Sequence, residues 1–133
     1  MLVRRLRTVL GMALILTLLV GCGGSGDVPV YRSADTPPGE ALNVDVTLRN
    51  YSFAPRRFEV RVGDMVQFNL RSIDIIHNFT IQDLGIEWHV PKDETIQQST
   101  VFDTPGQFRL ICTIPGHESM GMLGVINVVE KPS

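Results

Sequence analysis

The chain has 133 residues and a mass of 14.8 kDa, which suffices for one domain with an appendage and rules out a multidomain enzyme. Its 12 basic and 14 acidic residues give a formal net charge of −2. No basic cluster follows residue 10, which argues against nucleic acid as a partner. Hydrophobic residues make up 44% of the chain, and only two cysteines are present, so the chain is globular and has no disulfide framework.

The first 21 residues have the form of a secretory signal peptide. Three arginines within the first seven residues precede an apolar run over residues 9–20. This run is about a dozen residues long, whereas a membrane-spanning helix needs roughly 20, so a retained transmembrane helix is the weaker interpretation. The run ends at Cys22 in the sequence LVGC, which resembles the lipobox of bacterial lipoproteins. We therefore expect a lipoprotein signal peptide over residues 1–21 and a lipid on Cys22; the alternative is an ordinary signal peptide with a chance cysteine.

Residues 22–42 differ in composition from the rest of the chain. They contain a GGSG sequence and three prolines and show little hydrophobic periodicity, which is typical of a flexible tether. The folded domain is then expected over residues 43–133.

From residue 43 onward, short alternating apolar segments are separated by breaks every eight to twelve residues. This pattern predicts an all-β sandwich of about seven or eight strands. Gly63 and Asp64 suit a tight hairpin between two of the strands, and residues 83–94 are expected to form a loop with at most one short strand or helical turn. The expected strands are 44–49, 57–62, 65–71, 77–82, 97–102, 107–111 and 122–129.

Candidate metal ligands gather near the C-terminus. Cys112, His117, Met120 and Met122 lie within eleven residues, between two expected strands. A thiolate, an imidazole and a thioether form the soft ligand set that copper prefers. His77, at the start of an expected strand, is the candidate for the remaining ligand. Two histidines, one cysteine and a weak axial methionine make up the trigonal ligand set of a blue-copper electron-transfer site.

The chain resembles the cupredoxins, the small blue copper proteins, over about residues 43–130. The resemblance lies in residues 51–55 (YSFAP) with the following strands, in residues 77–79 (HNF), and in the segment from Cys112 to Met122. It implies a Greek-key β-sandwich with one type 1 copper ion that carries single electrons.

The same resemblance implies roles for individual residues. His77 and His117 would bind copper through ring nitrogens and Cys112 through its thiolate. Asn78 resembles the residue that forms a hydrogen bond across to the ligand segment and stiffens it. The axial ligand is expected to be Met122, because its surroundings resemble the Gly-Met-x-Gly of many cupredoxins; Met120 is the alternative.

Met120 also has the His-x-x-Met spacing of the binuclear copper domain of cytochrome oxidase subunit II. That family needs two bridging cysteines, and the expected domain contains only Cys112, which argues against a binuclear site. His89 is interpreted as a non-ligand because four ligands are complete without it. Trp88 and the six phenylalanines are expected to pack in or near the core.

Two functions remain open. The first is a one-electron carrier between larger redox proteins of unknown identity, without substrate turnover. It would be a monomer, held outside the cytoplasm by its lipid. Electrons would pass through the surface around His117, which is expected near Ile114, Pro115, Met120 and Leu123. The second is a periplasmic copper-delivery protein that handles Cu(I) for an oxidase, because the cysteine and two methionines also suit Cu(I).

Overall fold

The computed structural model describes residues 40–132. The expected signal peptide, Cys22 and almost all of the tether therefore lie outside the described residues. Within the described part, no helix has the length and hydrophobicity required to cross a bilayer.

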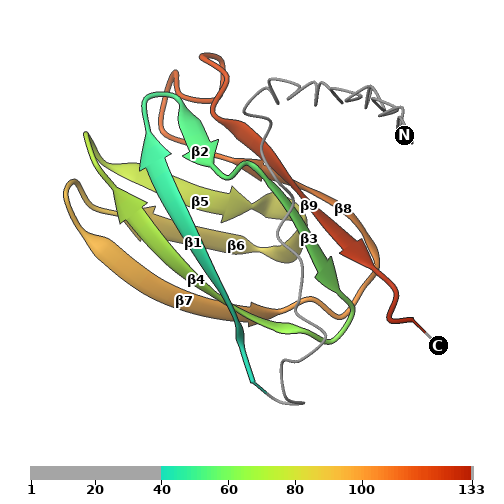
Figure 1. Cartoon of the computed structure of the whole chain (residues 1–133). Helices are drawn as coiled ribbons and strands as arrows, with labels where there is room; N and C mark the ends of the chain where they lie inside the picture. The colour runs from blue at the N-terminus through green and yellow to red at the C-terminus, as the bar shows by residue number, and fades with distance from the viewer. Residues whose placement is uncertain (1–39, 133) are drawn as a thin grey trace, which may run out of the picture.

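Residues 40–132 form nine strands and one 3₁₀ turn, arranged as two sheets packed face to face (Figure 1). The expected all-β sandwich is confirmed. The elements are β1 (Leu42–Arg49), β2 (Ser52–Ala54), β3 (Arg57–Arg61), β4 (Met65–Ser72), β5 (His77–Ile81), η1 (Gln82–Leu84), β6 (Ile86–Val90), β7 (Thr95–Val101), β8 (Gly106–Ile111) and β9 (Leu123–Val129).

One sheet has the strand order β2-β1-β4-β7 and the other has the order β3-β9-β8-β5-β6. The β1–β4 and β3–β9 pairs are parallel, and the remaining pairs are antiparallel. Because β5 and β8 run antiparallel with Thr80 opposite Ile111, the start of β5 lies beside the residues that follow β8. His77 begins β5 and Cys112 follows β8, so the topology brings these two residues to one end of the sandwich.

The core between the sheets follows from the alternation of side chains along the strands. In β4 every second residue is buried, from Val66 to Ser72, and points toward the opposite sheet. Five of the six phenylalanines are buried, and the sixth, Phe108, packs against the core from its edge. Trp88 stacks on Phe79, with ring centroids 5.7 Å apart and planes inclined by 15°, so it packs on the core as expected.

The turn at Gly63 and Asp64 differs from the prediction. It is tight, with Gly63 at φ +79° and the Asp64 N–H donating to the Arg61 carbonyl at 3.0 Å, but it does not join a hairpin. Instead the chain crosses between sheets, since β3 pairs with β9 and β4 pairs with β1 and β7. A turn sequence specifies a reversal of the chain, whereas long-range pairing decides which strands share hydrogen bonds.

Two strands were not among the seven expected. β2 has only three residues, too few for alternation to be recognised, and it extends one edge of the four-stranded sheet. β6 lies within the segment expected to be mainly loop, after η1, and forms an edge of the other sheet by pairing with β5.

Candidate copper centre

Three side chains converge at the end of the sandwich where β5 begins, one from β5 and two from the loop that follows β8. His77 and Cys112 are fully buried and His117 is 7% exposed. One possible ligand atom from each lies within 4.8 Å of the other two. The Nδ1 atoms of His77 and His117 are 3.2 Å apart, and the Cys112 Sγ is 3.4 Å from the His117 Nδ1.

These separations are a few tenths of an ångström shorter than those around one small bound metal ion. An ion bound in a trigonal arrangement at about 2.0–2.3 Å, the usual length of metal bonds to imidazole and thiolate, places its donor atoms about 3.5–4.0 Å apart. Two imidazoles and one thiolate are also the donors of trigonal copper sites. The residues present therefore fit a copper ion.

Residues 112–122, here called the ligand loop, hold two of these side chains by backbone hydrogen bonds. The Met122 N–H donates to the His117 carbonyl at 3.0 Å, and the Cys112 N–H donates to the Met122 carbonyl at 3.3 Å. Gly116 has φ +87°, a conformation that side chains disfavour, and it turns the chain immediately before His117. The loop is thus closed on itself by its own backbone.

Asn78 links β5 to the ligand loop. Its side-chain amide donates to the Thr113 Oγ1 at 2.6 Å, and its Oδ1 accepts a hydrogen bond from the Thr113 N–H at 2.8 Å. The backbone N–H of Asn78 also points at the Cys112 Sγ, at 3.5 Å. Hydrogen bonds of this kind orient metal ligands and adjust the electronic properties of a bound thiolate.

The two candidate axial methionines lie in different environments. Met122 is fully buried in the core, whereas Met120 is 61% exposed. The backbone of Met122 bonds to both Cys112 and His117, which keeps this residue beside the three convergent side chains. His89 points to solvent, with 67% of its side chain exposed, and lies 3.6 Å from Glu87.

Sequence reasoning missed Asp74, whose carboxylate contacts the ring of His77 on the side opposite the ligand atom. The His77 Nε2 and the Asp74 Oδ1 are 2.7 Å apart. An acid three residues before a candidate ligand histidine was the available signal, but the segment between them is an irregular loop whose geometry the sequence does not reveal.

Tyr51 is a second contact that the sequence did not predict. Its ring meets that of His117 edge-on, with centroids 5.2 Å apart and planes inclined by 72°. Tyr51 belongs to the turn between β1 and β2, so three separate segments enclose the histidines.

Two groups at the site have shifted pKa values. Burial raises the pKa of Asp74, but hydrogen bonds from the Asn50 N–H, the His77 ring and the Ile75 N–H outweigh it, so the pKa lies below its ordinary value. Burial and the neighbouring His77 lower the pKa of His117, with Asp74 opposing them. A lowered pKa favours the neutral imidazole, which is the form that binds metal ions.

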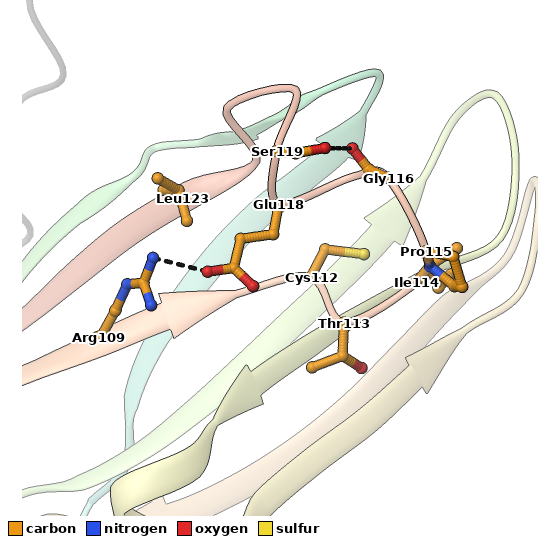
Figure 2. A pocket seen from close by; sticks show the side chains of 9 residues that line it. All are labelled: Arg109, Cys112, Thr113, Ile114, Pro115, Gly116, Glu118, Ser119 and Leu123. Atoms are coloured by element: carbon orange, nitrogen blue, oxygen red, sulfur yellow. Dashed lines mark hydrogen bonds and ion pairs between the residues drawn. The ribbon is translucent and has the colours of Figure 1, made fainter.

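The outer side of the ligand loop borders a surface pocket, shown in Figure 2. Arg109 on β8 donates to the Glu118 carboxylate at 2.7 Å, and the Ser119 hydroxyl donates to the Gly116 carbonyl at 2.9 Å. The first contact ties the loop to the sheet, and the second closes the turn that carries His117. Both contacts lie at the protein surface, so they hold the ligand loop from its solvent side.

Comparisons with known proteins agree with this site. The family model of the copper-binding proteins of the plastocyanin/azurin family matches residues 40–129, and the chain belongs to this family. It is therefore a cupredoxin, as the sequence predicts. In such a protein His77, Cys112 and His117 are positioned to bind a copper ion.

Individual relatives extend this result. The chain is 31% identical over 105 residues to cytochrome c oxidase subunit 2 of Thermus thermophilus, which covers 77% of this chain and 76% of the relative. The fold matches reduced auracyanin from the photosynthetic bacterium Roseiflexus castenholzii with a TM-score of 0.58, 17% identity and coverage of 68% and 99%. It also matches the periplasmic domain of cytochrome oxidase subunit II from Bradyrhizobium japonicum, with a TM-score of 0.58, 17% identity and coverage of 68% and 85%.

Proposed function

We propose that this protein is a mononuclear type 1 copper protein that carries single electrons between larger redox proteins. The observation that carries the proposal is the buried set of two Nδ1 atoms and one Sγ already held within 4.8 Å of one another. A copper ion held by these residues would accept one electron from a donor and pass it to an acceptor by changing between Cu(II) and Cu(I). The chain contributes a rigid set of donors, so little rearrangement accompanies the change of oxidation state.

Met122 would complete this proposed ligand set as its fourth and weakest ligand. It is buried beside Cys112 and His117, whereas the exposed Met120 lies at the surface of the same loop. The ligand loop contains one cysteine, Cys112, which favours one copper ion over a binuclear centre with two bridging cysteines.

The surface around the site suits a redox partner. Four of the six exposed large hydrophobic side chains among the described residues belong to segments that carry the site. Ile73, Ile75 and Ile76 lead directly into His77, and Met120 lies in the ligand loop; we call these four residues the apolar rim. A small apolar patch of this kind fits the weak, transient contacts of electron-transfer proteins.

We propose that Cys22, which lies outside the described residues, carries a lipid, and that the segment between Cys22 and the start of β1 tethers the copper domain to the outer side of a membrane. The support is the sequence pattern of residues 1–42, together with the structural likeness to a periplasmic domain. A tether of this length allows the domain to reach partners tens of ångströms away, at about 3 Å per extended residue.

Delivery of copper to an oxidase is the second candidate function. It is favoured by the similarity to cytochrome c oxidase subunit 2 and by the exposed Met120 thioether in the ligand loop, where a soft ligand can meet Cu(I). The buried and hydrogen-bonded ligand set supports the carrier, because a delivery protein needs a site that releases its ion readily.

Visible absorption and EPR spectra of the protein with one equivalent of Cu(II) test the carrier. An intense thiolate-to-copper charge-transfer band with narrow copper hyperfine splitting is expected, and Cys112→Ser should abolish this band while leaving the fold intact. A colourless protein that binds Cu(I) tightly would instead support copper delivery.

Electron self-exchange between oxidised and reduced copies tests the apolar rim without a known partner. Met120→Lys should slow self-exchange by about tenfold or more, because two like charges would then face each other when copies meet at the site. Met65→Lys is the matched control, since Met65 is also exposed but lies at the far end of β4. Equal rates in both variants would place the route of electron transfer elsewhere.

A further inference from the structure

The carboxylate of Asp74 links His77 to the turn between β1 and β2. Its Oδ1 accepts hydrogen bonds from the His77 Nε2 at 2.7 Å and from the Ile75 N–H at 2.7 Å. Its Oδ2 accepts a hydrogen bond from the Asn50 N–H at 2.6 Å. His77 is fully buried, whereas the Asp74 side chain is 29% exposed, so the carboxylate closes the site from the solvent side.

The hydrogen bond between the His77 Nε2 and Asp74 determines which ring nitrogen of His77 faces the copper site. A carboxylate only accepts hydrogen bonds, so the Nε2 must carry the proton that it donates to Asp74. The Nδ1 then presents its lone pair toward Cys112 and His117. The ring orientation of His77 therefore depends on Asp74.

The second oxygen of Asp74 extends this effect to the other histidine. Asn50, whose N–H it holds, directly precedes Tyr51, and the Tyr51 ring packs edge-on against His117 at 5.2 Å. One side chain thus orients His77 directly and fixes the turn that supports His117.

We propose that Asp74 is a positioning residue of the copper centre, which holds the His77 Nδ1 toward the metal and favours the oxidised ion over the reduced one. This inference rests on the proposed function. A thiolate and Cu(II) together carry a net charge of +1. One electron from a redox donor converts Cu(II) to Cu(I) without uptake of a proton, and the net charge falls to zero. A negative carboxylate behind the ligand ring stabilises the more positive state and makes the imidazole a stronger donor.

Other acids near the ligand loop are less able to act in this way. Glu118 is paired with Arg109, so its charge is balanced by a cation at 2.7 Å. Glu87 lies beside the exposed His89, and its contact with the site passes through the Asn78 side chain at 3.4 Å. Asp74 alone among these three contacts a histidine of the site directly.

The test compares the reduction potential and the Cu(II) and Cu(I) affinities of Asp74→Asn with those of the wild type. Loss of a carboxylate that orients a metal-bound histidine typically lowers metal affinity by about 10-fold to 100-fold, and we expect the loss to fall mainly on Cu(II). Each tenfold loss of Cu(II) affinity relative to Cu(I) raises the potential by about 59 mV. Asp103→Asn, before β8 at the opposite end of the sandwich, makes the same charge change and should leave the potential unchanged.

A blue spectrum with an unchanged potential in Asp74→Asn would overturn the proposal. If this variant does not fold, nitrogen-detected NMR of the copper-free wild type decides the question instead. The Nε2 of His77 should carry a proton that is protected from solvent exchange, whereas a tautomer protonated only on Nδ1 would overturn the proposal. This measurement needs no copper, so its result does not depend on whether the protein carries electrons. The absence of a blue spectrum in the wild type would show separately that the proposed electron-carrier function is wrong.

Discussion

The Nδ1 atoms of His77 and His117 lie 3.2 Å apart, although 40 positions separate the two residues along the chain. His77 is held by a strand start and by Asp74, and His117 by the backbone hydrogen bonds of the ligand loop. Each histidine is therefore held by contacts of its own as well as lying beside the other. The protein itself therefore sets the geometry that a copper ion meets, and each part of the arrangement can be tested separately.

Removal of the His117 side chain should open the site without unfolding the protein. His117 is the most exposed of the three convergent residues, so His117→Gly should leave a gap that connects with solvent. We expect the blue copper spectrum to be lost and to return when imidazole is added. His89→Gly, which removes an exposed ring, should keep the spectrum without imidazole. A spectrum that imidazole fails to restore would count against His117 as a ligand.

The two methionines of the ligand loop should respond differently to the same substitution. Met122→Gln should shift the reduction potential and the visible spectrum, because the axial ligand tunes both and Met122 is buried beside the site. Met120→Gln should change neither appreciably, because its side chain is largely in solvent. Voltammetry and absorption spectra of the two variants give the comparison, and the reverse ranking would transfer the axial role to Met120.

Asn78→Ala should destabilise the ligand loop. The substitution removes both hydrogen bonds between the Asn78 side chain and Thr113, and we expect the free energy of unfolding to fall by about 1–3 kcal/mol. Urea unfolding of the copper-free protein measures this loss. Asn69→Ala is the control, because the Asn69 side chain makes two hydrogen bonds on an exposed sheet face, whereas that of Asn78 makes two to Thr113 and a longer one, at 3.4 Å, to Glu87; the loss in Asn69→Ala should be smaller. Equal losses would mean that Asn78 has no special role in the loop.

Gly124→Ala should disturb the start of β9, just after the ligand loop. A Cβ at this position would lie 2.6 Å from the Arg56 carbonyl oxygen, which accepts a hydrogen bond from the Val125 N–H. We expect a loss of about 1–3 kcal/mol in the free energy of unfolding, because the two backbone segments must move apart. Thermal unfolding followed by circular dichroism checks this, and a melting temperature equal to that of the wild type would contradict it.

Much of the fold was predictable because strand alternation is a local property. All seven expected strands correspond to strands of the structure, with ends that differ by no more than two residues. Pairing was not predictable in the same way. The turn at Gly63 was recognised, but its two strands enter different sheets, because β3 and β4 find their partners far along the chain.

The chemistry of the site was also readable from the sequence. Cys112, His117, Met120 and Met122 lie within eleven residues, and a thiolate, an imidazole and a thioether together predict a soft metal such as copper. What the loop sequence does not reveal is the arrangement around these residues. Asp74 and Tyr51 reach the histidines through turns whose shapes depend on how β1, β4 and β5 pack.

Side-chain alternation and donor chemistry are properties of short segments, so the class of fold and the kind of metal ligand can be predicted from the sequence alone. The tertiary structure decided which strands pair, that Met122 is buried while Met120 is exposed, and that the Asp74 carboxylate lies behind His77. These features depend on the register between residues distant in the chain, and that register follows from the packing of the whole core.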